Sequence, residues 1–221
     1  MIMRQLREIW PMALAAMAAG TAIAAVIAIE AGVADNPSGR PVRGATLKGV
    51  AEFQAITDAG MRSRALFTEA AKVITDPRCI NCHPASRSPT QGDAMHPHMP
   101  PIQAGKSGTG IAGLNCHSCH RFTNTTLPGS RVGSVPGAEH WLLAPASMAW
   151  QGLTLGEICK QLKDPARNGG RSLADIHRHM STDHLVSWAW HPGEGRRPAP
   201  GSQEEFGALI EAWITTGAEC P

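Results

Sequence analysis

The sequence lacks any long run of basic residues, and its 221 residues carry a formal net charge of only +2. A chain without clustered lysine and arginine has no signature of nucleic-acid binding, so we expect no nucleic-acid partner. The chain also contains no run of alternating strand character longer than four residues. That absence argues against a fold built on extended strands. Cysteine is scarce as well, with six residues, but four of them are arranged in a pattern.

Two pentapeptides carry this pattern, namely Cys79-Ile-Asn-Cys82-His83 and Cys116-His-Ser-Cys119-His120. Cys-x-x-Cys-His is the signature of covalent c-type haem attachment. The two thiols form thioethers with the haem vinyl groups, and the adjoining histidine supplies a nitrogen ligand to the iron. The sequence therefore predicts two covalently bound haem c groups. Their proximal iron ligands are His83 and His120.

Other uses of paired cysteines explain the pattern less well. Two Cys-x-x-Cys pairs also form zinc ribbons, but that interpretation leaves both following histidines unexplained. A thioredoxin-like redox pair is expected within alternating strands and helices, which do not surround either motif. Only 33 residues separate Cys82 from Cys116, which favours two haems in one compact domain over two independent domains.

The N-terminus predicts export from the cytoplasm. Arg4 and Arg7 precede an uncharged stretch, residues 11–29, and small residues follow it before Asp35. This is the pattern of a secretory signal peptide, although the apolar stretch is long enough to remain as a membrane anchor. We therefore assign residues 1–34 to a signal peptide or anchor, with membrane contact possible through 11–29. Both alternatives predict a periplasmic protein, secreted or tethered to the inner membrane.

The remaining chain divides into a linker and one domain. Residues 35–46 are rich in proline, glycine and arginine and are typical of a linker, and residues 47–221 are long enough for one domain with its own core. The charge of the exported part is still +2, and four haem propionates would make the balance slightly negative. Cys159 and Cys220 are the cysteines left over. In an oxidising compartment they predict one disulfide, and two buried free thiols are the alternative.

The hydrophobic pattern predicts helices separated by long loops. Helical periodicity runs over 47–75 with a possible break at Gly60, and residues 84–113 and 123–145 read as loops. Capping signals at Thr154, Ser172 and Ser202 predict three helices in the last third, the final one ending near Gly217. We thus expect a mostly α fold with extensive loops: a single compact dihaem cytochrome c domain after an N-terminal hydrophobic helix.

Two clusters of histidine and methionine offer distal iron ligands. One is Met95-His-Pro-His-Met99 in the loop between the motifs, and the other is His177, His179 and Met180 on a predicted helix. An exposed polar loop with an adventitious metal site is the alternative for the first, and an amphipathic helix with solvated histidines is the alternative for the second. Met148, next to Trp150, is a further candidate ligand or a core methionine. Methionine ligation raises the reduction potential of an iron relative to histidine ligation.

The chain after residue 50 resembles a group of small bacterial dihaem cytochromes c described as isoquinoline 1-oxidoreductase subunits. The matching segments are Arg64-Ala-Leu-Phe-Thr-Glu-Ala, Asp76-Pro-Arg-Cys-Ile-Asn-Cys-His-Pro84, His98-Met-Pro-Pro, Leu143-Ala-Pro, Met148-Ala-Trp, Lys163-Asp-Pro-Ala-Arg-Asn-Gly-Gly-Arg171, Pro198-Ala-Pro-Gly and Gly217-Ala-Glu-Cys-Pro221. The resemblance implies that His98 and His179 are the distal ligands, and Met148, Met180 and His96 stay as alternative candidates from the residues. It also implies a redox partner of the molybdenum hydroxylase type.

We therefore expect an electron carrier, not an enzyme: a periplasmic dihaem cytochrome that relays single electrons from a dehydrogenase to the respiratory chain. The rival hypothesis is a dihaem peroxidase in which one iron keeps an open site, and a third possibility is a cytochrome subunit permanently bound to a dehydrogenase. An iron with both axial positions filled cannot readily bind peroxide or oxygen. Distal ligation therefore separates the first two hypotheses.

Overall fold

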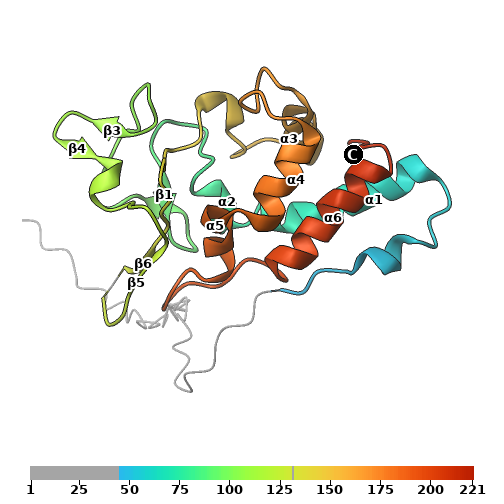
Figure 1. Cartoon of the computed structure of the whole chain (residues 1–221), viewed down its shortest axis with the longest axis horizontal. Helices are drawn as coiled ribbons and strands as arrows, with labels where there is room; N and C mark the ends of the chain where they lie inside the picture. The colour runs from blue at the N-terminus through green and yellow to red at the C-terminus, as the bar shows by residue number, and fades with distance from the viewer. Residues whose placement is uncertain (1–44, 131) are drawn as a thin grey trace, which may run out of the picture. The chain divides into compact units, whose positions relative to one another are not determined.

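The computed structural model describes residues 45–221 except residue 131, and Figure 1 shows the order of the elements. The α-helices are α1 (Ala59–Ile74), α2 (Pro77–Ile80), α3 (Leu155–Lys163), α4 (Leu173–Thr182), α5 (His184–Ser187) and α6 (Gln203–Thr215). Short 3-10 helices are η1 (Val50–Phe53), η2 (Cys116–Ser118), η3 (Ala146–Met148) and η4 (Trp188–Trp190). The proposed signal peptide or anchor and most of the proposed linker lie outside the described residues.

Three antiparallel pairs of short strands occupy the middle of the chain. They are β1 (Thr90–Gln91) with β2 (His96–Pro97), β3 (Gly110–Ile111) with β4 (Leu114–Asn115), and β5 (Thr125–Leu127) with β6 (Gly133–Val135). In Figure 1 these pairs gather in one part of the molecule, and helices α1, α3, α4 and α6 gather in another. The first motif begins in helix α2, and the second motif follows strand β4 directly.

The main core lies where α6 packs against α1 and α4. Buried apolar residues of α1 recur at the spacing of one helical face, as Leu66, Phe67, Ala70, Val73 and Ile74. The rings of Phe67 and Trp213 lie 5.0 Å apart between their centroids. A smaller apolar cluster surrounds the second motif, formed by Ala104, Cys116, Trp141 and Leu143.

The predicted helix starts in the last third are confirmed. Thr154 and Ser172 each form a reciprocal capping box with the acidic residue three positions later, and Ser202 caps α6. These caps satisfy backbone N–H groups that otherwise lack a partner in the first turn. The helical pattern does break, but it breaks between Phe53 and Ala59 and not at Gly60. Helix α1 begins at Ala59, because the Asp58 side chain accepts a hydrogen bond from the Met61 N–H.

The predicted disulfide joins Cys159 of α3 to Cys220. Their Cα atoms are 5.6 Å apart and 61 positions separate them in sequence. A cross-link over a loop of this length stabilises the folded state by about 4 kcal/mol in the chain-entropy model. The bond ties the end of the chain to a helix that also supports the first motif.

The predicted fold class, mostly α with extensive loops, is wrong. The described part is only 39% helical, and it contains three small sheets in segments that we expected to be loops. The strands were missed because runs of two or three residues are too short to show alternation. No helix among residues 45–221 is long and apolar enough to cross a membrane, and the expected N-terminal hydrophobic helix falls on residues outside the described part.

Candidate functional site

The first motif forms one tight turn at the end of α2. Asp76 caps this helix by accepting a hydrogen bond from the Arg78 N–H, and Pro77 occupies the first turn, where it needs no N–H partner. The His83 N–H then donates to the Cys79 carbonyl at 3.1 Å. The turn therefore brings Cys79, Cys82 and His83 to the wall of the same cavity.

The second motif repeats this local structure on a different element. The Asn115 side chain caps η2 by accepting a hydrogen bond from the His117 N–H at 2.8 Å. The His120 N–H donates to the Cys116 carbonyl at 2.9 Å. Two unrelated sequence contexts thus produce the same turn, because the spacing of the motif suits it.

Each motif lines its own cavity. The first cavity has a volume of about 570 Å³, and the second has a volume of about 470 Å³. Both volumes lie within the range of ordinary small-molecule and cofactor sites. Four residues line both cavities, so the two spaces are neighbours: Cys82, Pro136, Trp141 and Trp188.

The motif histidines are oriented by backbone carbonyls. The Nδ1 atom of His83 lies 2.7 Å from the Met148 carbonyl oxygen, and the Nδ1 atom of His120 lies 2.7 Å from that of Pro136. A hydrogen bond at Nδ1 places the ring proton there and leaves Nε2 as the free nitrogen. In both rings the lone pair of Nε2 is therefore free to bind a metal.

Burial keeps these side chains neutral. It lowers the pKa of His83 to about 4 and the pKa of His120 to about 4, because a charged imidazolium loses its hydration there. Burial also raises the pKa of Cys82 to about 11 and the pKa of Cys79. Neutral imidazoles and thiols in an apolar cavity fit the side-chain chemistry that haem attachment requires.

A tryptophan stacks on each motif histidine. The ring centroids of His83 and Trp150 are 3.6 Å apart with an interplanar angle of 3°, and those of His120 and Trp141 are 3.8 Å apart at 16°. Trp150 is held in turn by Gln161, whose Oε1 accepts from the indole N–H at 2.6 Å. Stacking and carbonyl bonding together leave each imidazole little rotational freedom.

Histidines outside the motifs also line the cavities, and the exposed His140 is one of two such histidines in the first cavity. His179 of α4 lines the first, and its Nδ1 lies 2.8 Å from an Asp183 carboxylate oxygen. His98 lines the second, and its Nδ1 lies 2.9 Å from the Pro100 carbonyl oxygen. As with the motif histidines, these hydrogen bonds leave Nε2 free.

The two histidines of the second cavity are separated by a distance suited to one metal ion between them. Their ring centroids are 6.2 Å apart. Two imidazole nitrogens that each lie about 2 Å from one metal have ring centres about 6 Å apart when they bind from opposite sides. His98 and His120 therefore fit a shared iron. His179 and His83 line the same cavity.

The alternative distal candidates differ in position. Met180 is buried and lines the first cavity beside His179. Met148 lines it too, but its backbone carbonyl already holds His83, so it belongs to the proximal side. His96 is exposed in β2 and lines neither motif cavity. His177 is likewise absent from both walls, so the cluster on α4 contributes only its second and third members.

The sequence analysis missed three kinds of supporting residue. The sequence indicates Trp141 and Trp150 as core and haem-packing residues but not that they stack on the motif histidines, and Asp183 was not singled out. Arg78 and Arg196 line the first and second cavities respectively and were missed altogether. Arg78 lies directly before Cys79, which was a local signal that could have identified it.

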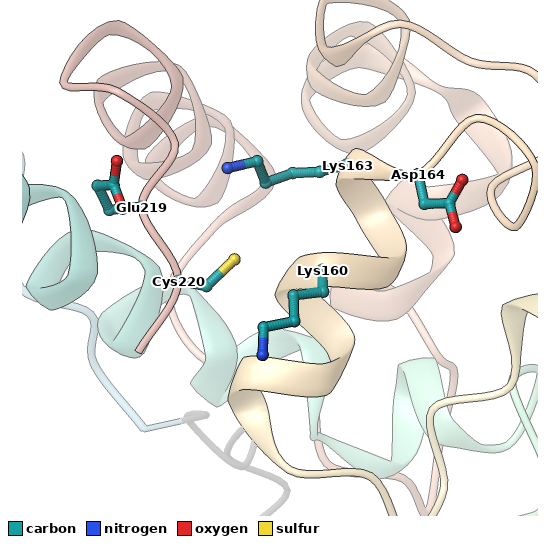
Figure 2. A pocket seen from close by; sticks show the side chains of 5 residues that line it. All are labelled: Lys160, Lys163, Asp164, Glu219 and Cys220. Carbon is teal, nitrogen blue, oxygen red and sulfur yellow. The ribbon is translucent and has the colours of Figure 1, made fainter.

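A third cavity, with a volume of about 400 Å³, lies beside the disulfide (Figure 2). The residues that line it are Lys160, Lys163, Asp164, Glu219 and Cys220. In Figure 2 the Lys163 side chain extends from α3 toward the C-terminal segment, where its Nζ donates to the Ala218 carbonyl at 2.7 Å. This cavity contains no histidine and lies apart from the motifs, so it is a structural feature of the α3 end.

No group of three or more histidine, cysteine, aspartate or glutamate side chains is arranged to hold a metal ion among residues 45–221. A haem iron requires only axial ligands from the protein, because the porphyrin supplies the others. The paired histidines fit that smaller requirement.

Comparison of the chain with models of protein families, with curated proteins and with solved structures finds no match. The functional argument therefore depends on the geometry of the two cavities and on the motifs.

Proposed function

We propose that this protein is a periplasmic c-type cytochrome with two covalent haems, which relays single electrons from a dehydrogenase toward the respiratory chain. Cys79 and Cys82 would attach one haem, and Cys116 and Cys119 the other. When bound, each haem supplies an iron that takes up and releases one electron. The protein supplies orientation, axial nitrogens and exclusion of water.

One observation carries the proposal. Each Cys-x-x-Cys-His turn lines a cavity in which a second histidine, held through its Nδ1 atom, also lines the wall. Paired imidazoles would occupy both axial positions of each iron and leave none for peroxide. This arrangement favours an electron carrier over a peroxidase.

The second site reaches the surface of the protein. Cys119 of the second site is exposed, and apolar side chains near its cavity are also exposed, including Met99, Phe122 and Leu127. Residues of the helical core such as Ile74 and Phe206 line part of the first cavity, and the exposed side chain of Leu142 lines it as well. We propose that partner proteins exchange electrons at the second site through a small, transient contact. The resemblance noted above suggests a molybdenum hydroxylase-type dehydrogenase as one such partner.

The test is to produce the full chain in cells with a working cytochrome c maturation apparatus and to measure its mass and absorption. We expect the mass of two haems, a low-spin spectrum and no turnover of hydrogen peroxide. The Cys79→Ser/Cys82→Ser and Cys116→Ser/Cys119→Ser variants should each lose one haem, whereas Cys159→Ser/Cys220→Ser should keep both. A mature chain with the mass of its polypeptide alone would falsify the proposal, and a high-spin band with peroxide turnover would support a peroxidase instead.

A further inference from the structure

A cluster of arginines lies along the boundary between the two cavities. Arg78 is buried and lines the first cavity, and Arg196 lines the second. Their guanidinium carbons lie 5.9 Å and 5.7 Å from the centroid of the Trp188 ring. Trp188 lines both cavities, so one indole contacts a cation belonging to each.

The charges of this cluster do not balance among the residues described. Arg78 donates to the carboxylate of Asp93, and Arg197 lies 3.8 Å from an Asp76 carboxylate oxygen. The backbone N–H of Arg197 also donates to a carboxylate oxygen of Asp93 at 3.1 Å. Arg196 donates only to the Ser134 and Pro192 carbonyl oxygens. Three guanidinium groups thus share two carboxylates, which leaves one positive charge in excess.

The Arg78 guanidinium also has N–H donors without a hydrogen-bond acceptor among the described residues. Within residues 45–221, its Nε and Nη1 atoms are closed off from water and donate no hydrogen bond, although Nε lies 3.8 Å from an Asp76 oxygen. A buried cation with unused donors is costly unless an anion accepts from it. Carboxylates and phosphates are the anions whose geometry matches a planar guanidinium, and the propionates of a haem are carboxylates.

We propose that Arg78 and Arg196 bind the propionate carboxylates of the two porphyrins, Arg78 from the first cavity and Arg196 from the second. This inference depends on the proposed function, since it identifies residues that position the haems and set their potentials. A fixed cation beside a haem favours the reduced state of its iron, because reduction adds a negative charge to the site. Each arginine should therefore raise the reduction potential of its own haem.

The experiment measures the two reduction potentials and the haem content of the full mature chain in three single variants. Arg78→Gln should lower one reduction step, and Arg196→Gln should lower the other, with both haems retained by mass. Arg62→Gln is the matched control, because Arg62 also has a buried Nε without a hydrogen-bond partner but lines neither cavity. It removes the same charge and should leave both potentials unchanged.

Two further arms separate this inference from its alternatives. Arg78→Lys keeps the charge and should shift the potential less than Arg78→Gln, and it remains informative if the glutamine variant does not fold. In the wild-type protein, the potentials should not depend on added inorganic phosphate. A phosphate-dependent shift that Arg78→Gln abolishes would identify a free anion as the ligand and overturn the assignment. Haem-loaded variants whose potentials match those of Arg62→Gln would also overturn it, while absence of haem would instead refute the proposed function.

Discussion

The motif histidines are held by backbone carbonyls, and the second histidines are held at the same ring atom. His98 uses the Pro100 carbonyl, and His179 uses the Asp183 carboxylate. A carboxylate partner makes an imidazole a stronger donor than a carbonyl partner does. Because His179 alone has such a partner, the first site should have the more electron-rich axial ligand.

Removing either second histidine should change the spectrum of one haem only. We expect His98→Ala and His179→Ala each to convert about one haem in two from low spin to high spin, because one axial position opens. His96→Ala is the control, since His96 lines neither motif cavity. The measurement is the oxidised absorption and electron paramagnetic resonance spectrum. Unaltered spectra in both variants would contradict the ligand assignment.

At the scale of elements, helix α3 supports the first site through one buried side chain. Gln161 accepts from the Trp150 indole N–H and donates to the Ser147 and Ala149 carbonyls at 2.5 Å and 3.0 Å. It thereby fixes the segment 147–150, which includes the carbonyl that holds His83. The disulfide fixes the same helix to the chain end.

Substitution Gln161→Leu should destabilise the protein by about 2 kcal/mol, because it leaves a buried indole N–H and two half-buried carbonyls without their partner. The free energy of unfolding from chemical denaturation measures this change. Gln54→Leu, at an exposed position after η1, is the control and should change it by less than about 0.5 kcal/mol. A near-neutral result for Gln161→Leu would mean that these hydrogen bonds do not hold the segment.

At the scale of the whole molecule, the exposed apolar side chains lie unevenly. Phe122 is 74% exposed and Met99 is 65% exposed, and both lie beside the second motif or its cavity. Buried aromatic and methionine side chains are enriched where proteins bind one another. The surface around the second site is therefore the expected contact for a redox partner.

Replacing Phe122 with serine should slow electron exchange with a protein partner several-fold without moving either reduction potential. The expected cause is loss of apolar contact area in the encounter complex, since Phe122 lines neither motif cavity. Stopped-flow oxidation by a partner protein measures the rate, with a small inorganic oxidant as the reference. The control is Met61→Ser, which removes an exposed apolar side chain on α1, far from Phe122 in the sequence. An equal loss with the inorganic oxidant would contradict a docking role.

The features that could be predicted from the sequence are those formed by neighbouring residues and the one disulfide. The Cys-x-x-Cys-His turns and the capping boxes at Thr154 and Ser172 arise from contacts within five residues. The disulfide followed because only two cysteines remained outside the motifs. The class of fold could not be predicted from the sequence, because strands of two or three residues are too short to show an alternating pattern.

Long-range packing determines which residues far apart in the sequence lie together in the fold. It brought His98 opposite His120, stacked Trp150 on His83, and left His96 outside both cavities. It also brought Arg78 and Arg196, which are far apart in the chain, to one indole. Local periodicity cannot predict such pairs, because long-range packing selects among many histidines and arginines that look alike in sequence.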